Sequence, residues 1–212
     1  AHAAENYGCD VVTTTISREQ YRGAESLIKK KGLEKKVKLL KSDYRDLDGM
    51  YDKLVSIEMI EAVGHHYLDA FIKKCGSLIK PGGQIALQAI TVPDDAYGRH
   101  KAESTFINKH IFPGSCLISL QDLTARMDRI CGMKLVDEYD ITEHYARTMN
   151  EWRARFHDNM DKVRALGLPE EFIRMWDFYL ASCEAGFDQR WIGDYQLVYA
   201  KQENGINTGS QN

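Results

Sequence analysis

No apolar run in this sequence of 212 residues approaches the roughly 18 residues of a membrane-spanning helix. The N-terminal residues lack the basic region and the apolar stretch of a signal peptide. The chain also has no basic excess, because 28 Lys and Arg oppose 31 Asp and Glu, which argues against general nucleic-acid binding. Five cysteines without CxxC spacing predict neither a disulfide framework nor a zinc site, and they fit a reducing cytoplasm.

A glycine-rich turn is also missing. Open α/β sheets that bind nucleotides usually carry such a turn after the first strand, and no GxGxxG pattern occurs here. The first eight residues are typical of the end of a helix that leads into a second strand. We therefore expect the first strand and its glycine loop to lie upstream of residue 1, which would make this chain a fragment.

What the sequence does contain is an alternation of strand-like and helical runs. Ser17 followed by Gln20 forms a capping box that opens a helix to about Lys31. A second helix is expected from about Glu61 to the stop signal Lys80-Pro-Gly-Gly83. The expected strands are 10–16, 37–40, 53–57, 84–92, 133–139 and 195–199. This order predicts an α/β fold, a mainly parallel sheet with helices on both faces.

Two segments interrupt the alternation. Large apolar side chains step by three or four along 145–160 and 172–183, as on buried helix faces. Because these helices come before the last strand, we expect them to cap the carboxyl edge of the sheet. The interpretation is a single catalytic domain, 1–212, with cap segments at about 97–130 and 145–190.

The loops that follow the strands are expected to line one crevice, because open α/β sheets bind ligands outside the carboxyl ends of their strands. An acidic residue beside an aromatic ring, as at Asp43 and Tyr44, suits a ligand with hydroxyl groups and a flat base. Equally, Asp43 can cap a turn while Tyr44 packs. The residues in these loops are Thr15, Ile16, Gln20, Asp43, Tyr44, Arg45, Glu58, Glu61, Gln88, Ala89 and Ile90.

Several segments together resemble the cyclopropane fatty acid synthase family of S-adenosylmethionine-dependent methyltransferases, which includes the mycolic acid cyclopropane synthases. The most specific set is Ser56-Ile-Glu with Glu61-Ala-Val-Gly64, Ile111-Phe-Pro-Gly114 and Cys183-Glu-Ala-Gly-Phe187. The likeness extends from about residue 8 to residue 200. It implies a Rossmann-like class I methyltransferase sheet with a helical, lipid-binding cap, and it places the family's glycine loop just upstream of this chain.

The resemblance implies transfer of the methyl carbon of S-adenosylmethionine to a cis double bond of a phospholipid acyl chain. A carbocation then loses a proton to a bound bicarbonate, and a cyclopropane ring closes. The family's bicarbonate ligands carry over to Glu61, Ile90 and Tyr145, while Gln88 stands where His is usual. A Gln amide donates a hydrogen bond but cannot shuttle a proton. Without the resemblance, Glu61 also fits a helix-start carboxylate, and Tyr145 a core residue.

On the cofactor side, the resemblance places one group of residues at the ribose and methionine part of S-adenosylmethionine, and another around its adenine. The first group is Thr15, Ile16 and Gln20, and the second is Asp43, Tyr44 and Arg45.

Cys183 matches a cysteine once proposed as catalytic in the family, although a small buried thiol in a helix stripe is the simpler interpretation. Adjacent His65 and His66 point different ways on a helix, so no metal site is expected.

The expected partner is an unsaturated phospholipid, and the expected location is cytoplasmic. A lysine cluster allows peripheral contact with an anionic inner membrane face, although such clusters are usually solvated helix ends; it comprises Lys29, Lys30, Lys31, Lys35, Lys36, Lys38 and Lys41. Two alternatives stay open. Gln88 could favour a methyl or methylene branch without ring closure, or the chain could be a non-catalytic fragment that binds lipid or a partner.

Overall fold

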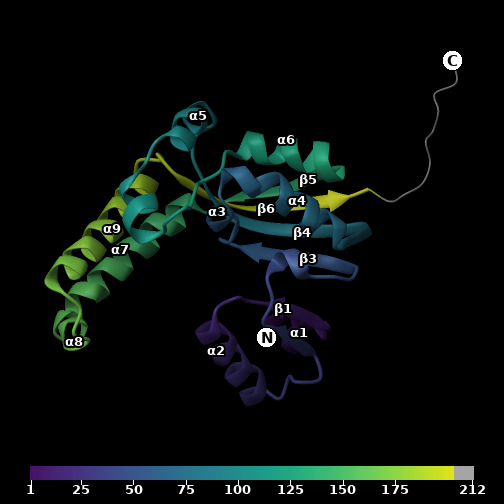
Figure 1. Ribbon diagram of the computed structural model, residues 1–212, viewed down its shortest axis with the longest axis horizontal. Helices are drawn as coiled ribbons and strands as arrows, with labels where there is room; N and C mark the ends of the chain where they lie inside the picture. The colour runs from purple at the N-terminus through teal and green to yellow at the C-terminus, as the bar shows by residue number, and fades with distance from the viewer. Residues whose placement is uncertain (203–212) are drawn as a thin grey trace, which may run out of the picture. The chain divides into compact units, whose positions relative to one another are not determined.

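The structure is a computed structural model that describes residues 1–202, and its chain divides after Gly49 into two compact units. Figure 1 labels the elements of both. The first unit consists of α1 (His2–Tyr7), β1 (Val11–Thr14), α2 (Arg18–Lys30), β2 (Val37–Leu40) and the short 3₁₀ helix η1 (Tyr44–Asp46).

The first unit is a two-stranded parallel sheet with helices packed against it. β1 and β2 pair in parallel, as expected. The Ser17 half of the predicted capping box is confirmed, because the Ser17 hydroxyl accepts a hydrogen bond from the Gln20 N–H at 3.3 Å, whereas the Ser17 N–H donates to the Thr15 hydroxyl and not to the Gln20 side chain. Ala4, Ile28 and Val37 form a small buried cluster. The carboxyl ends of both strands lie together, since the N–H of Thr15 donates to the carbonyl of Leu40.

The second unit is built on a four-stranded sheet with the order β3-β4-β6-β5. Its elements are β3 (Tyr51–Ile57), α3 (Ile60–Val63), the 3₁₀ helix η2 (His65–Tyr67), α4 (Leu68–Ser77), β4 (Ile79–Thr91), α5 (Asp94–Ala102), the π-helix η3 (Ile107–Ile111), α6 (Leu120–Cys131), β5 (Met133–Asp140), α7 (Thr142–Asp158), α8 (Met160–Ala165), α9 (Glu170–Asp188) and β6 (Gly193–Lys201).

The predicted mainly parallel sheet holds for the direction of β3, β4 and β5, which run the same way, and β6 is the strand of this sheet that departs from it. β3 and β4 are parallel, but β6 runs antiparallel to both β4 and β5, between which it lies. The reason is the helical insertion of α7, α8 and α9 after β5. This insertion holds the chain at the carboxyl edge of the sheet, so β6 starts there and runs back. Residue patterns within a strand carry no information about its direction.

The expected helix from Glu61 is also broken into pieces. Gly64 has a φ of 75° and separates α3 from η2, and α4 ends at Ser77. The Lys80-Pro-Gly-Gly83 run then lies inside β4, which begins at Ile79. It therefore shapes the start of a strand, where it was expected to end a helix.

One face of the sheet is covered by α4 and α6. Ile85 and Tyr199 are fully buried on this face, and the Tyr199 hydroxyl is 3.0 Å from the Thr124 hydroxyl of α6. The two helices touch at Gly76, where a Cβ would lie only 2.5 Å from that of Cys131.

The opposite face of the sheet is open at β3 within this unit. Val55 and Ile57 are 66 % and 63 % exposed there. The residue alternation along β3 therefore separates a covered face from a face that this unit leaves open.

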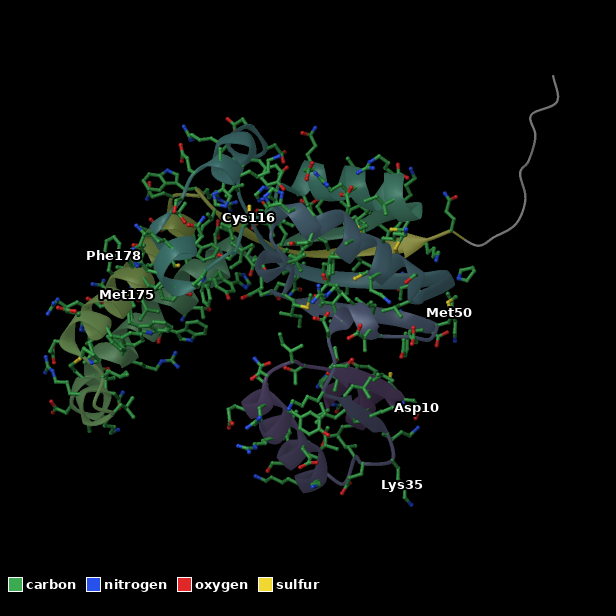
Figure 2. The ribbon with its side chains drawn as sticks, in the orientation of Figure 1. Asp10, Lys35, Met50, Cys116, Met175 and Phe178 are labelled. Atoms are coloured by element: carbon green, nitrogen blue, oxygen red, sulfur yellow. The ribbon has the colours of Figure 1, made fainter. Side chains whose placement is uncertain are left out.

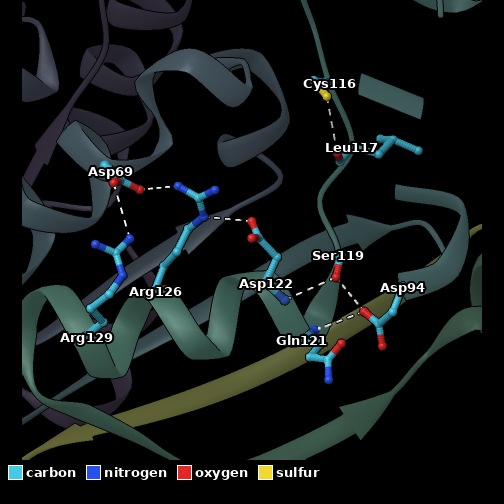
Figure 3. Close-up of polar contacts among 9 residues, drawn as sticks. All are labelled: Asp69, Asp94, Cys116, Leu117, Ser119, Gln121, Asp122, Arg126 and Arg129. Atoms are coloured by element: carbon cyan, nitrogen blue, oxygen red, sulfur yellow. Dashed lines mark hydrogen bonds and ion pairs between the residues drawn. The ribbon is translucent and has the colours of Figure 1, made fainter. Parts of the chain in front are cut away.

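Polar contacts fix α6 against its neighbours, as Figure 3 shows. The Ser119 hydroxyl caps α6 by accepting from the Asp122 N–H at 3.1 Å, and it donates to Asp94 of α5. Arg126 of α6 binds both Asp122 and Asp69, the latter from α4. α6 is therefore part of the helical layer that covers the sheet. The expected cap segment 97–130 is thus too long, because its part from Leu120 onward belongs to this layer.

The helical hairpin of α7 and α9, joined by α8, extends from one end of the sheet (Figure 1). Its buried cluster consists of Met149, Leu180, Cys183 and Phe187, of which the predicted apolar stripes include Met149 and Cys183, while Trp152 and Phe172 of the stripes are exposed. Phe178, labelled on α9 in Figure 2, meets the ring of Phe106 edge to face. In the part of the chain that the structure describes, no helix has both the length and the apolar content to cross a membrane.

Candidate active site

A cavity of about 610 Å³ lies in the second unit, between the carboxyl edge of its sheet and the helical hairpin. Most of its wall is apolar or aromatic, and two acidic side chains, Glu58 and Glu61, reach it from the segment after β3. Arg99 and His100 line it from α5. The apolar part of the wall includes Ile90, Val92, Ile107, Phe112, Met149, Trp152, Tyr179, Phe187, Trp191 and Ile192.

Glu58 is the centre of a hydrogen-bonded cluster at this edge. Its Oε1 accepts from the Gln88 side-chain amide at 2.7 Å, and its Oε2 accepts from the Tyr145 hydroxyl at 2.7 Å. The Glu58 backbone has a φ of 48°, in the left-handed region that non-glycine residues seldom adopt. Its N–H donates to the Gln88 carbonyl at 2.9 Å, which fixes this turn against β4.

Glu61 lies beside this cluster at the start of α3. Its side chain is buried, and its Oε1 accepts from the backbone N–H of Ile90 at 2.7 Å. The other oxygen, Oε2, is buried without a hydrogen-bond partner. Burial raises the pKa of Glu61, partly opposed by the Ile90 N–H and reinforced by the charge of Glu58. Glu61 thus stands at the expected helix start, and it contacts Ile90 directly, although both were expected to face a bound bicarbonate.

Asp194 adds a third carboxyl group from the first residues of β6. Its side chain is fully buried; Oδ2 accepts from the Gln88 amide at 3.1 Å, and Oδ1 has no partner. Burial raises the pKa of Asp194 to about 7, with a further contribution from the charge of Glu58. The same Gln88 amide nitrogen therefore bridges two carboxyl groups, while its oxygen accepts from Gln196 at 3.1 Å.

The aromatic and sulfur side chains of the hairpin remain uncharged. Burial and the hydrogen bond to Glu58 raise the pKa of Tyr145, so its hydroxyl keeps its proton and acts as a donor. Burial also raises the pKa of Cys183 to about 11. Cys183 lines the cavity and belongs to the buried hairpin cluster, which fits the simpler interpretation of this thiol as a packing residue.

The residues expected to contact the cofactor lie in the first unit, at the carboxyl ends of β1 and β2. The Thr15 hydroxyl donates to the Gln20 side-chain oxygen at 2.7 Å and accepts from the Ser17 N–H at 3.1 Å. The side chain of Ile16 is 74 % exposed. This pair of loops thus offers an apolar side chain beside a polar pair.

Asp43 acts as a turn cap, one of its two expected roles. Its Oδ1 accepts from the Arg45 N–H at 2.9 Å and caps η1, and both carboxylate oxygens bind the Arg45 guanidinium. These hydrogen bonds lower the pKa of Asp43 to about 2. Both oxygens of the Asp43 carboxylate therefore already accept hydrogen bonds from Arg45.

The structure gathers Glu61, Gln88, Ile90 and Tyr145 at one edge, although Gln88 reaches the cavity only through Glu58. Sequence reasoning placed Glu58 in a strand-end loop without a role, and it missed Asp194. The antiparallel direction of β6 explains the second omission, because a parallel β6 would start at the other edge of the sheet.

The chain is 39 % identical over 195 residues to the tuberculostearic acid methyltransferase UfaA1 of Mycobacterium tuberculosis, covering 92 % of this chain and 46 % of that protein. It is 32 % identical over 209 residues to the cyclopropane-fatty-acyl-phospholipid synthase of Escherichia coli, covering 97 % and 51 %. The chain thus spans about half the length of these curated relatives.

Among solved structures, the mycolic acid cyclopropane synthase CmaA1 complexed with SAH and CTAB matches with a TM-score of 0.84 and 26 % identity, covering 94 % of this chain and 73 % of that one. The expected Rossmann-like class I methyltransferase fold is thereby confirmed. The sequence model of the mycolic acid cyclopropane synthetases matches residues 1–197, and the chain therefore belongs to the mycolic acid cyclopropane synthetase family.

Proposed function

We propose that the full-length protein containing this chain transfers the methyl carbon of S-adenosylmethionine to a double bond in a lipid acyl chain. The observation that carries the proposal is the cavity of about 610 Å³, whose apolar wall ends at a cluster of carboxyl groups. Such a cavity suits a long apolar substrate with a reacting centre beside acidic groups. The names of the two curated relatives, one a methyltransferase and one a synthase, support the same chemistry.

When bound, S-adenosylmethionine supplies an electrophilic methyl group. Its proposed contacts are Thr15, Ile16 and Gln20, which the first unit presents at the end of β1, together with Tyr44 and Arg45 in the turn after β2. Asp43 is proposed to act indirectly by fixing that turn. The complex of CmaA1 with SAH supports cofactor use of this type.

The substrate is proposed to be an unsaturated phospholipid whose acyl chain enters the apolar cavity. Met149, Trp152 and Phe112 supply contacts for methylene groups. The rings of Tyr145 and Tyr179 supply aromatic faces, each of which can stabilise a nearby cation by about 0.5–2 kcal/mol. A cytoplasmic protein in peripheral contact with the inner membrane face would meet such a substrate.

The bicarbonate that the resemblance implies does not fit the residues of this site. An anion needs hydrogen-bond donors, and the three donors assigned to it are all engaged by carboxyl groups. Gln88 and Tyr145 both donate to Glu58, and the N–H of Ile90 donates to Glu61.

Two products are consistent with this chemistry. Ring closure to a cyclopropane is the first candidate, and it matches the name of the Escherichia coli relative. A methyl or methylene branch is the second. It is supported by the methyltransferase name of the 39 % identical relative.

The test is incubation of the full-length protein with S-adenosylmethionine and vesicles of dioleoyl phosphatidylglycerol. Mass spectrometry should show acyl chains heavier by one CH₂ group, and proton NMR separates a cyclopropane from a methylene branch. Binding of S-adenosylmethionine without any change in the lipid would favour the non-catalytic alternative. Unchanged lipid without cofactor binding would refute the proposal altogether.

A further inference from the structure

The Glu58 carboxylate lies between two of the groups that the family resemblance assigns to a bicarbonate ion, Gln88 and Tyr145. A carboxylate and a bicarbonate ion present the same hydrogen-bonding edge, two oxygens on one carbon. Glu58 places such an edge between the Gln88 amide and the Tyr145 hydroxyl, with both donor distances at 2.7 Å. These are two of the groups that the family resemblance assigns to the ion. The side chain is therefore positioned as a covalently attached substitute for it.

We propose that the Glu58 carboxylate is the proton acceptor in this protein, in place of a bound bicarbonate; the proposal rests on the proposed methyl transfer. Once the alkene carbon has bonded to the methyl group, the neighbouring carbon is a cation. One C–H bond of the transferred carbon breaks. Its electron pair forms the new carbon–carbon bond, and its proton moves to Glu58, which becomes a neutral carboxylic acid.

The position of Glu58 meets the geometric requirements of such a base. Glu58 lines the apolar cavity, so it can reach a substrate held there. Its carboxylate is held from both sides, and each oxygen retains a further lone pair. The backbone is held in the left-handed region, at a φ of 48°, which non-glycine residues seldom adopt. Strain of this kind is often kept at functional sites.

The neighbouring carboxyl groups are less suited to the role. Glu61 shares its Oε1 with the Ile90 N–H, and burial favours its protonated form. Asp194 is fully buried and does not line the cavity. Asp194 and Gln88 are better described as positioning residues, because the Gln88 amide joins Asp194 to Glu58.

Two substitutions of Glu58 separate this role from a structural one. Glu58→Gln keeps the shape but removes the base, so kcat should fall by about 10²–10⁴-fold with little change in KM. Glu58→Gly also removes the base, but it suits the φ of 48° and frees Gln88 and Tyr145 to bind an anion. Added bicarbonate should therefore restore turnover in Glu58→Gly and leave Glu58→Gln inactive.

The assay uses the full-length protein in carbonate-free buffer, with and without added bicarbonate, and ¹³C-bicarbonate NMR reports ion binding directly. The parent should be active without bicarbonate and should not bind it, whereas Glu58→Gly should bind it. Glu151→Gln, on the exposed side of α7, is a matched carboxyl-to-amide control that should behave as the parent.

Three results would overturn the proposal while leaving the methyl transfer intact: a parent that needs bicarbonate, a parent that binds it, or Glu58→Gln at the parental rate. A parent that leaves the lipid unchanged at every bicarbonate concentration would instead refute the proposed function, and the role of Glu58 with it. If Glu58→Gln does not fold, the rescue of Glu58→Gly decides the question alone.

Discussion

The buried carboxyl group of Asp194 should make the second unit less stable as the pH rises from 4 to 7. Burial, aided by the charge of Glu58, raises the pKa of Asp194 from an ordinary 3.8 to about 7. In the unfolded chain the group returns to its ordinary pKa. Between these two values the folded protein holds a proton that the unfolded chain has lost, so a rise in pH favours unfolding.

The size of the effect follows from the two pKa values. Their separation corresponds to about 4 kcal/mol, and the part that falls between pH 5 and 8 is about 3 kcal/mol. Asp194→Asn removes the titration but keeps a side-chain oxygen that can accept from Gln88. The free energy of unfolding of Asp194→Asn minus that of the parent should therefore rise by about 3 kcal/mol across this range.

The measurement is urea unfolding at several pH values, followed by tryptophan fluorescence. The three tryptophans of this chain, Trp152, Trp176 and Trp191, lie in the same unit as Asp194. The difference between variant and parent cancels other buried groups, such as Glu61, whose pKa is also raised.

Asp140→Asn is the matched control for this measurement. Burial by itself would raise the pKa of Asp140. Hydrogen bonds from Thr142 and Arg190 outweigh burial and hold this pKa below its usual value. Its stabilising effect is therefore complete above pH 4 and lost only as the pH falls further, so its difference from the parent should be flat between pH 5 and 8. A flat difference for Asp194→Asn as well would refute the reasoning about Asp194.

Three further predictions concern single side chains. Gln88→Leu removes the amide that holds the Glu58 carboxylate in position, so kcat should fall by roughly ten- to a hundredfold, whereas Gln88→His should keep the donor, the rate and the lipid product; a Gln88→Leu enzyme at the parental rate would contradict this. Cys183→Ala should stay within about threefold of the parental turnover, because a thiol with a pKa of about 11 is not a nucleophile at neutral pH. A folded but inactive variant would show that the cysteine is catalytic. Gly76→Ala should lower the free energy of unfolding by about 1–3 kcal/mol in urea titrations, because the new Cβ would lie 2.5 Å from that of Cys131. An unchanged unfolding midpoint would show that α4 and α6 can separate there at no cost.

Local sequence patterns determined the elements that depend on near neighbours. The Ser17 cap, and the helical stripes that contain the buried Met149 and Cys183, follow from residues a few positions apart. Asp43 shows the limit of such patterns, because the sequence allowed a cap or a ligand contact and the structure shows the cap. The resemblance supplied most of the candidate site, since it assigned Glu61, Gln88, Ile90 and Tyr145 to one place.

Only the tertiary structure decided the direction of β6 and the use of Glu58. The strand pattern of residues 195–199 is the same in either direction, and what reverses β6 is the long helical hairpin that precedes it. That reversal brings Asp194 to the edge where Glu58 and Gln88 lie, 106 residues from Gln88 in the chain. Hydrogen bonds between such distant residues depend on the packing of whole elements, and for that reason no local pattern reveals that the donors for an anion are already taken.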